Sequence, residues 1–137
     1  MKNLTLIICL DDGGGMTFLG KRQSRDRVLL SEMFDSFSGP IYVLPYSTSI
    51  LGEHEGRYIS SDAPIKDAPE GGVVFLERGS IAAVIDEVET LVIYRWNRRY
   101  PKDSAIDIDL GAWRVSESRE FVGSSHDKIT KLVMKRR

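Results

Sequence analysis

The stretch that decides the fold is Leu4-Thr5-Leu6-Ile7-Ile8-Cys9-Leu10, which runs directly into Asp11-Asp12-Gly13-Gly14-Gly15. Residues 4–10 place apolar side chains on both alternating faces, a pattern that a strand shows when both faces of its sheet are covered. The glycines that follow have no side chain to pack, so they predict a loop at the end of this strand. We therefore predict an α/β fold with this strand at the centre of its sheet.

Composition indicates one folded domain spanning residues 1–137. The chain has 137 residues, of which 42% are hydrophobic, and this length suits one core and leaves no room for a second. Lys and Arg number 19 against 20 Asp and Glu, so no basic excess is available to neutralise nucleic-acid phosphates. The apolar run 4–10 ends at two aspartates instead of a small-residue cleavage site, and no apolar run is long enough to cross a bilayer. We expect a cytoplasmic protein without nucleic-acid or membrane partners, and its oligomeric state stays open.

The rest of the pattern predicts alternating helices and strands that end in an antiparallel pair. Ser24 is expected to cap a helix whose apolar stripe runs from Val28 to Phe37, and Ser80 is expected to cap a second, shorter helix. Period-two segments at 113–121 and 129–135 predict an antiparallel pair at a sheet edge. The other predicted elements are strands at 41–44, 57–60, 73–77 and 91–96 and a surface loop at 61–72.

The order of these elements, together with several motifs, resembles dihydrofolate reductase. The opening strand ends in an aspartate and a glycine loop, and a helix with an acidic residue, Asp26, near its start follows. The tail carries the other matching motifs, Leu91-Val92-Ile93-Tyr94, Tyr100-Pro101-Lys102-Asp103, Ile106-Asp107-Ile108-Asp109 and Ala112-Trp113-Arg114-Val115-Ser116. The resemblance implies a central mixed sheet flanked by helices, with a C-terminal antiparallel hairpin and a chain trimmed relative to the family. It also implies NADPH as a cofactor.

Two cofactor-binding features of the resembled family are replaced in this chain. Family members carry a Gly-Arg pair after the second strand, where this chain has Leu44-Pro45-Tyr46-Ser47-Thr48. They also carry a Gly-Gly pair that opens a later helix, where this chain has Glu77-Arg78-Gly79-Ser80. Gly79 and Ser80 still offer backbone N–H groups that could hold an anion, so they are the candidate cofactor-binding residues. The replacements favour a protein without nicotinamide chemistry.

A second set of motifs resembles a group of short bacterial proteins that carry the name ribonuclease Z. The motifs are Asp11 with Gly15-Met16-Thr17-Phe18, Arg22-Gln23-Ser24-Arg25-Asp26-Arg27, Tyr94-Arg95-Trp96-Asn97-Arg98-Arg99-Tyr100-Pro101 and Gly123-Ser124-Ser125-His126. A zinc-dependent ribonuclease of that class needs a His-rich ligand set for two metal ions. This chain contains only His54 and His126, so we predict no metal site and judge the name to be misapplied.

Candidate ligand-binding residues gather at strand ends and at the start of the first helix. Segment 22–27 has three arginines, and arginine side chains and helix N-terminal N–H groups suit carboxylate or phosphate. Segment 96–100 follows a central strand, where open α/β sheets bind ligands, and aromatic faces with arginine can stack a flat ring. Together with residues 13–20, these two segments are expected to border one cleft. The alternative is that their side chains have structural roles, as helix caps, surface ion pairs and core packing. The candidate ligand-binding residues are Asp11, Arg22, Gln23, Ser24, Trp96, Asn97, Arg98 and Tyr100.

Asp26 is the candidate catalytic residue. By analogy with the resembled family it would hold or protonate a pterin-like heterocycle, which requires a partly buried carboxyl group with a raised pKa. The alternative is a structural carboxylate that the helix dipole stabilises. The sequence thus predicts a divergent dihydrofolate-reductase-like protein that binds a small molecule, namely a planar anionic heterocycle or a nucleotide. A non-catalytic binding or interaction protein on the same scaffold is the alternative, and a nucleotide or RNA hydrolase is a more distant third.

Overall fold

The computed structural model describes residues 2–10, 15–18, 21–22, 26–77, 80–96, 104–105, 107–124 and 128–137. The strands are β1 (Leu4–Leu10), β2 (Gly15–Phe18), β3 (Lys21–Arg22), β4 (Ile41–Val43), β5 (Tyr58–Ser60), β6 (Val73–Phe75), β7 (Val88–Arg95), β8 (Ser104–Ala105), β9 (Trp113–Phe121) and β10 (Ile129–Arg136). The α-helices are α1 (Arg27–Asp35) and α2 (Pro64–Asp67). Short 3₁₀ turns cover Pro45–Ile50, Gly52–His54, Ile85–Glu87 and Leu110–Ala112.

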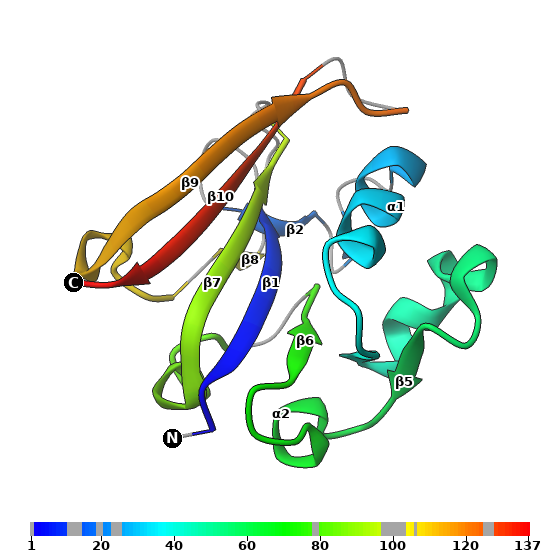
Figure 1. The fold of residues 1–137 in the computed structure, drawn as a ribbon, viewed down its shortest axis with the longest axis horizontal. Helices are drawn as coiled ribbons and strands as arrows, with labels where there is room; N and C mark the ends of the chain where they lie inside the picture. Colours follow the sequence, from blue (N-terminus) through cyan, green and yellow to red (C-terminus); the bar gives the residue numbers. More distant parts are fainter. Residues whose placement is uncertain are drawn as a thin grey trace.

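Seven of these strands form one mixed sheet in the order β5-β4-β6-β1-β7-β10-β9 (Figure 1). The neighbours from β5 to β7 run parallel, whereas β10 runs antiparallel to both β7 and β9. A smaller sheet joins β3, β2 and β8, which the sequence did not predict. The α/β class and the C-terminal antiparallel pair predicted from the sequence are confirmed.

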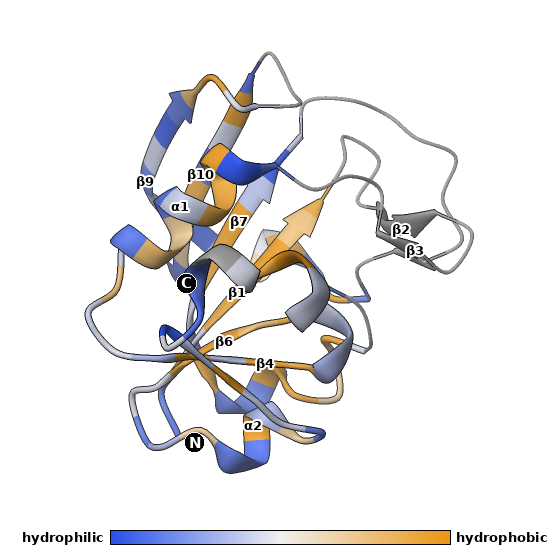
Figure 2. Cartoon of the chain, turned by 90° about the vertical axis from the view of Figure 1, so that its right-hand side faces the viewer, coloured by the Kyte–Doolittle hydropathy of each residue, from blue (hydrophilic) through white to orange (hydrophobic). Residues whose placement is uncertain are grey.

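The central strand β1 is buried on both faces, as its apolar pattern predicted. Leu4, Leu6 and Ile8 are fully buried in a core on one face of the sheet, and Ile7 is fully buried in a second core on the other face. The hydropathy colouring shows the hydrophobic character of this strand (Figure 2). Its register with β6 and β7 places the carboxyl ends of all three strands at the same edge of the sheet.

Helix α1 covers the second core and is capped by Asp26 instead of the predicted Ser24. Asp26 Oδ1 accepts the backbone N–H of Val28 at 3.0 Å and that of Leu29 at 3.1 Å, which is the geometry of an N-cap. Ser24 lies outside the described residues. The buried stripe of the helix is Leu29, Leu30, Met33 and Phe34, whereas Val28, predicted on the stripe, is 41% exposed.

The second predicted helix, capped by Ser80, is not formed. Residues 81–84 make a turn, Ile85–Glu87 make a 3₁₀ turn, and Val88 already belongs to β7. The physical reason is pairing along β1, because Val88 lies opposite Leu4 in the parallel ladder. Val88 is thereby held in strand geometry, and only the short 3₁₀ turn Ile85–Glu87 precedes it. The predicted surface loop 61–72 contains the short helix α2.

Gly123→Ala is expected to destabilise the fold because Gly123 packs directly against the helix cap. A Cβ at this position would lie 2.3 Å from Asp26 Oδ2 and 2.6 Å from Ile129 Cδ1. Overpacking of this kind costs about 1–3 kcal/mol. Gly39→Ala is the matched control, since a Cβ there meets no atom within 4 Å. Urea unfolding should give a lower midpoint for Gly123→Ala alone, and equal midpoints for the two variants would contradict this packing.

Candidate functional site

The connections of the sheet diverge at the carboxyl ends of β1 and β6. The chain that leaves β1 returns through α1, which packs on one core, and the chain that leaves β6 passes through residues 81–87, which pack on the other core. Neighbouring parallel strands whose connections lie on opposite faces open a crevice at their carboxyl ends, where α/β sheets bind ligands. The carboxyl ends of β1 and β6 are therefore a position where this topology favours a ligand site.

Glu77 and Cys9 bring polar groups to this edge. Glu77 follows β6 and is only 7% exposed, and Cys9 is the next-to-last residue of β1. Burial, with a smaller contribution from the charge of Glu77, raises the pKa of the Cys9 thiol well above its usual range. A neutral thiol is a poor nucleophile, so Cys9 serves as a packed side chain. The sequence did not predict Glu77 at this edge, although a carboxylate at the end of an apolar strand was the available signal.

A groove of about 580 Å³ lies on the sheet face opposite α1. Leu44 and Leu76, which follow β4 and β6, line it together with Lys2 and Glu87, which precede β1 and β7, so the groove is not confined to the carboxyl edge. This volume is within the range of about 300–1,000 Å³ found for small-molecule sites. The lining residues are Lys2, Leu44, Asp62, Ala63, Pro64, Ile65, Lys66, Leu76, Val84 and Glu87.

The turn beside this groove holds the carboxylate of Asp107. Asp107 Oδ1 accepts the backbone N–H of Ile81 at 2.9 Å and that of Ala82 at 2.8 Å, and Oδ2 accepts the Ser80 hydroxyl at 2.5 Å. The hydrogen bonds from Ser80 and Ala82 lower the pKa of Asp107. The sequence predicted that Ser80 helps to bind the anion of a ligand. In the structure, the Asp107 carboxylate accepts the Ser80 hydroxyl instead. Gly79 lies outside the described residues.

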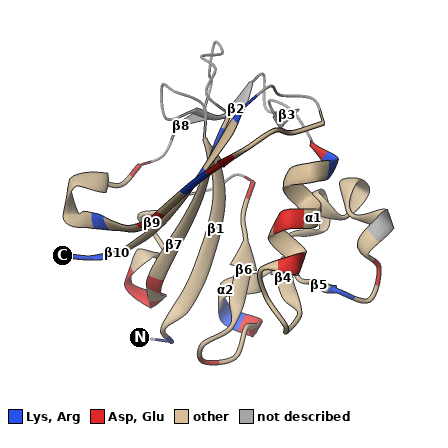
Figure 3. Ribbon diagram, turned by 45° about the horizontal axis from the view of Figure 1, so that its top comes forward, with Lys and Arg blue, Asp and Glu red and all other residues tan. Residues whose placement is uncertain are grey.

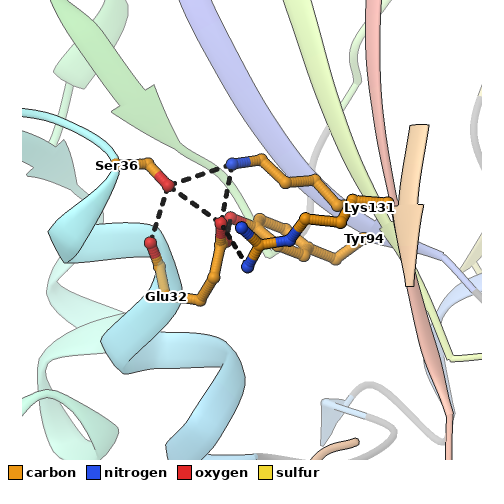
Figure 4. Close-up of polar contacts among 5 residues, drawn as sticks. Glu32, Ser36, Tyr94 and Lys131 are labelled. Atoms are coloured by element: carbon orange, nitrogen blue, oxygen red, sulfur yellow. Dashed lines mark hydrogen bonds and ion pairs between the residues drawn. The ribbon is translucent and has the colours of Figure 1, made fainter. Parts of the chain in front are cut away.

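A second polar cluster fastens α1 to the sheet (Figure 4). Glu32 Oε1 accepts hydrogen bonds from Lys131 Nζ at 2.8 Å and from the Ser36 hydroxyl at 3.0 Å, and Oε2 accepts one from the Tyr94 hydroxyl. Burial by itself would raise the pKa of Glu32, but hydrogen bonds from Lys131 and Tyr94 outweigh it and lower that pKa. Burial and the contact with Glu32 raise the pKa of Tyr94. The charges of Glu32 and Lys131 pair with each other, so the cluster joins α1 to β10.

Asp26, the candidate catalytic residue, lies in a structural setting. Its side chain is 1% exposed, and Oδ1 accepts the Ser124 backbone N–H at 2.9 Å in addition to the two helix N–H groups. The Ser124 hydroxyl in turn accepts the backbone N–H of Arg27 at 2.9 Å. These contacts tie the start of α1 to the connection between β9 and β10.

Among the predicted ligand-binding residues, the structure describes the side chain of Trp96 alone. Trp96 is 5% exposed in the core beneath α1, and its backbone N–H donates to Leu10 at 2.9 Å, which holds the end of β7 beside the end of β1. Arg22 belongs to β3, but its side chain is not described. Asp11, Gln23, Ser24, Asn97, Arg98 and Tyr100 lie outside the described ranges. Of the predicted cleft, the structure describes the backbone of β2 and of Arg22 and the side chains of Asp26, Arg27 and Trp96.

The distribution of charged and metal-binding side chains gives no second site within the described ranges. Lys and Arg are interspersed with Asp and Glu over the ribbon (Figure 3). In this part of the chain, no group of three His, Cys, Asp or Glu residues is placed to hold a metal ion. None of the helices in the described part of the chain is long and apolar enough to cross a membrane.

Glu32→Gln should change the pH dependence of stability. Because the pKa of Glu32 is lowered in the folded protein, its carboxylate stabilises the fold at pH values above its ordinary pKa of 4.5. This contribution is lost as the pH falls through the folded-state pKa. The free energy of unfolding should therefore differ most between wild type and Glu32→Gln near neutral pH, and the two should converge on acidification. Glu120→Gln is the control, because Glu120 and its partner Lys128 are both more than half exposed. A constant difference between wild type and Glu32→Gln at all pH values would contradict this reading.

Asp26→Asn and Asp26→Ala should separate the cap from the charge. Asparagine keeps an oxygen that can accept hydrogen bonds from the N–H groups of Val28, Leu29 and Ser124. Alanine has no acceptor, so all three N–H groups lose this hydrogen bond. Loss of a cap costs about 0.5–2 kcal/mol, so Asp26→Ala should unfold at lower urea concentration and Asp26→Asn should stay close to wild type. Equal destabilisation by both substitutions would show that the cap oxygen does not matter.

Comparison with known proteins identifies the fold. No protein-family model matches the chain, and no curated protein matches it. Among solved structures, dihydrofolate reductase from Enterococcus faecalis, complexed with NADP(H) and RAB-propyl, is similar with a TM-score of 0.67. The match covers 99% of this chain and 97% of that chain at 13% identity, a level at which the likeness shows the fold alone. The chain therefore has the dihydrofolate reductase fold.

Proposed function

We propose that the protein binds a small planar molecule, either a heterocycle or the base of a nucleotide, in the groove between α2 and residues 81–87. The observation that carries this proposal is a largely apolar groove of about 580 Å³ on the sheet face opposite α1. It is lined by Leu44 and Leu76, which follow β4 and β6, and by Lys2 and Glu87, which precede β1 and β7. Small-molecule sites are largely apolar pockets of this size with a few polar groups.

The chemistry of the groove favours a ring held by its apolar faces. Leu44, Ile65 and Val84 supply apolar surface, and burying such surface contributes roughly 25 cal/mol per Å². The charged lining residues are Lys2 and Lys66 together with Asp62 and Glu87, so their formal charges cancel. The Lys2 amine already donates to the carbonyl groups of Ile65 and Ala68. A ligand would thus be selected by shape and apolar contact more than by charge.

The residues beside the groove do not fit the phosphates of a dinucleotide. The Enterococcus faecalis structure contains NADP(H), so the fold makes this cofactor the first one to consider. In this chain the N–H groups of Ile81 and Ala82 already bind Asp107. Leu44 and Pro45 follow β4, where the resembled family has a Gly-Arg pair. We therefore propose a binding function without nicotinamide chemistry, in line with the non-catalytic alternative derived from the sequence.

A catalytic role for Asp26 remains a second proposal. The observation that favours it is a carboxyl group only 1% exposed at the start of α1, near the end of the sheet where ligands bind. Asp26→Asn retains a cap oxygen and cannot donate a carboxyl proton, so loss of turnover with a stable fold would support a catalytic role.

The cytoplasmic location stays a prediction from the sequence.

A panel of ligands should identify the class that fits the groove. Thermal unfolding with adenosine, AMP, folate and NADPH should show stabilisation by at least one of them, about 2.7 kcal/mol when the ligand is present at 100 times its Kd. Ala63→Trp should abolish the shift because the indole would occupy the groove. Val115→Trp, at a half-exposed position on β9, is the control and should keep the shift. No stabilisation by any ligand, or a shift that survives Ala63→Trp, would contradict the proposal.

A further inference from the structure

We infer that two copies of this chain associate through strand β9, so that their seven-stranded sheets join into one continuous sheet. In this contact β9 and its copy run antiparallel, with Ser118 of one chain opposite Ser118 of the other. None of the nine described residues of β9 lines the groove, so the inference goes beyond the proposed function and does not depend on it.

Strand β9 forms a long, exposed edge of the seven-stranded sheet (Figure 1). It spans nine residues, and all of those from Arg114 to Glu120 are exposed. Within the described ranges, β9 pairs with β10 on one side and with no strand on the other. A long edge strand presents a row of N–H and C=O groups to which another strand can add. Strand β9 therefore offers the backbone groups that an added strand requires.

Hydrogen-bond geometry restricts how two copies of β9 can pair. In an antiparallel edge strand, every second residue directs both its N–H and its C=O outward. Outward residues of the two copies must lie opposite each other, so the two-fold axis of the pair passes through a residue position. The register between β9 and β10 shifts at Ser116, so the regular part of β9 runs from Glu117 to Phe121. The centre of the pair is consequently one of these five residues.

Charge selects one of these centres. A centre at Glu117, Arg119 or Glu120 would place two like charges directly opposite each other, which destabilises a cross-strand pair. A centre at Phe121, the last residue of β9, would leave most of the strand unpaired. A centre at Ser118 sets Glu117 opposite Arg119 twice, and cross-strand pairs of opposite charge are favourable. The sequence Glu117-Ser118-Arg119 is thus complementary to its own antiparallel copy, which makes a second copy of this chain the partner.

Arg119 is positioned to take part in this contact. Its guanidinium lies 3.5 Å from Glu32 Oε1, while its side chain is 56% exposed. Glu32 also pairs with Lys131, at the shorter distance of 2.8 Å. A guanidinium has five N–H donors in a fork, so Arg119 can bind Glu117 of the second copy and keep its contact with Glu32. Glu117 and Arg119 are two residues apart on a regular strand, so both side chains lie on the same face of the sheet.

Pairing at this edge stops at two copies. The two-fold axis makes the contact isologous, so each β9 is covered by the other and no free β9 edge remains. The opposite edge of the sheet is β5, which has only three residues. Very short edge strands discourage the addition of further strands. The expected assembly is therefore a dimer, without larger oligomers.

Sedimentation equilibrium with protein up to about 1 mM tests the contact, and wild type should form a reversible dimer. Glu117→Arg sets arginine opposite arginine twice, and Arg119→Glu sets glutamate opposite glutamate twice. Each variant alone should dimerise at least about tenfold more weakly than wild type. An equimolar mixture of the two variants should restore the dimer, because every cross-strand pair then joins opposite charges. Glu120→Arg is the matched control and should dimerise like wild type, since Glu120 lies opposite Ser116 in this register.

Ser118→Cys tests the register and does not require Arg119→Glu to fold. Directly opposite residues have Cβ atoms about 4.5–5.5 Å apart, close to the separation that a disulfide requires. Mild oxidation should therefore link two copies of Ser118→Cys. Glu120→Cys is the control and should stay unlinked, because its two copies lie four residues apart along the ladder, about 13 Å. Wild type controls for the native Cys9.

A wild type that stays monomeric up to about 1 mM would overturn the inference. A dimer that Glu117→Arg leaves unchanged would also overturn it, because the contact would then lie elsewhere on the surface. Equal cross-linking of Ser118→Cys and Glu120→Cys would exclude the register centred at Ser118.

Discussion

Burial of β1 on both of its faces is the constraint on which the rest of the structure depends. Leu6 and Ile8 face one core and Ile7 faces the other, so β1 can lie only where chain covers both sides of the sheet. Parallel pairing with β6 and β7 then places three carboxyl ends at one edge. The connections that leave β1 and β6 cross on opposite faces of the sheet, which is the topology that opens a crevice at the carboxyl ends of such strands.

The two faces of the sheet are closed to different degrees, and the proposed function uses that difference. Helix α1 closes one face and is held at its start by Asp26, in its middle by Glu32 and Lys131, and at its end by Arg57, whose guanidinium donates to Phe34 at 2.8 Å. The other face is covered by the four-residue helix α2 and by turns. The short elements leave the apolar groove between them, whereas α1 packs its buried stripe against the core on its side of the sheet.

Local patterns revealed much of the fold and little of the site. The burial of β1 and the pairing of β9 with β10 follow from apolar periodicity, which is a property of neighbouring residues. The helix predicted after Ser80 does not form because Val88 pairs with Leu4 in the ladder of β1, and no local signal shows a strand partner so far along the chain. Trp96 illustrates the same limit. An aromatic residue at a strand end gives the same sequence pattern whether it stacks on a ligand or packs in the core, as Trp96 does in this structure.

The most direct test of the account is a crystal structure of the protein with adenosine bound. The account predicts the base in the groove between Leu44 and Val84. Adenosine bound on the α1 face of the sheet, or a crystal grown with adenosine that shows none in the groove, would contradict it.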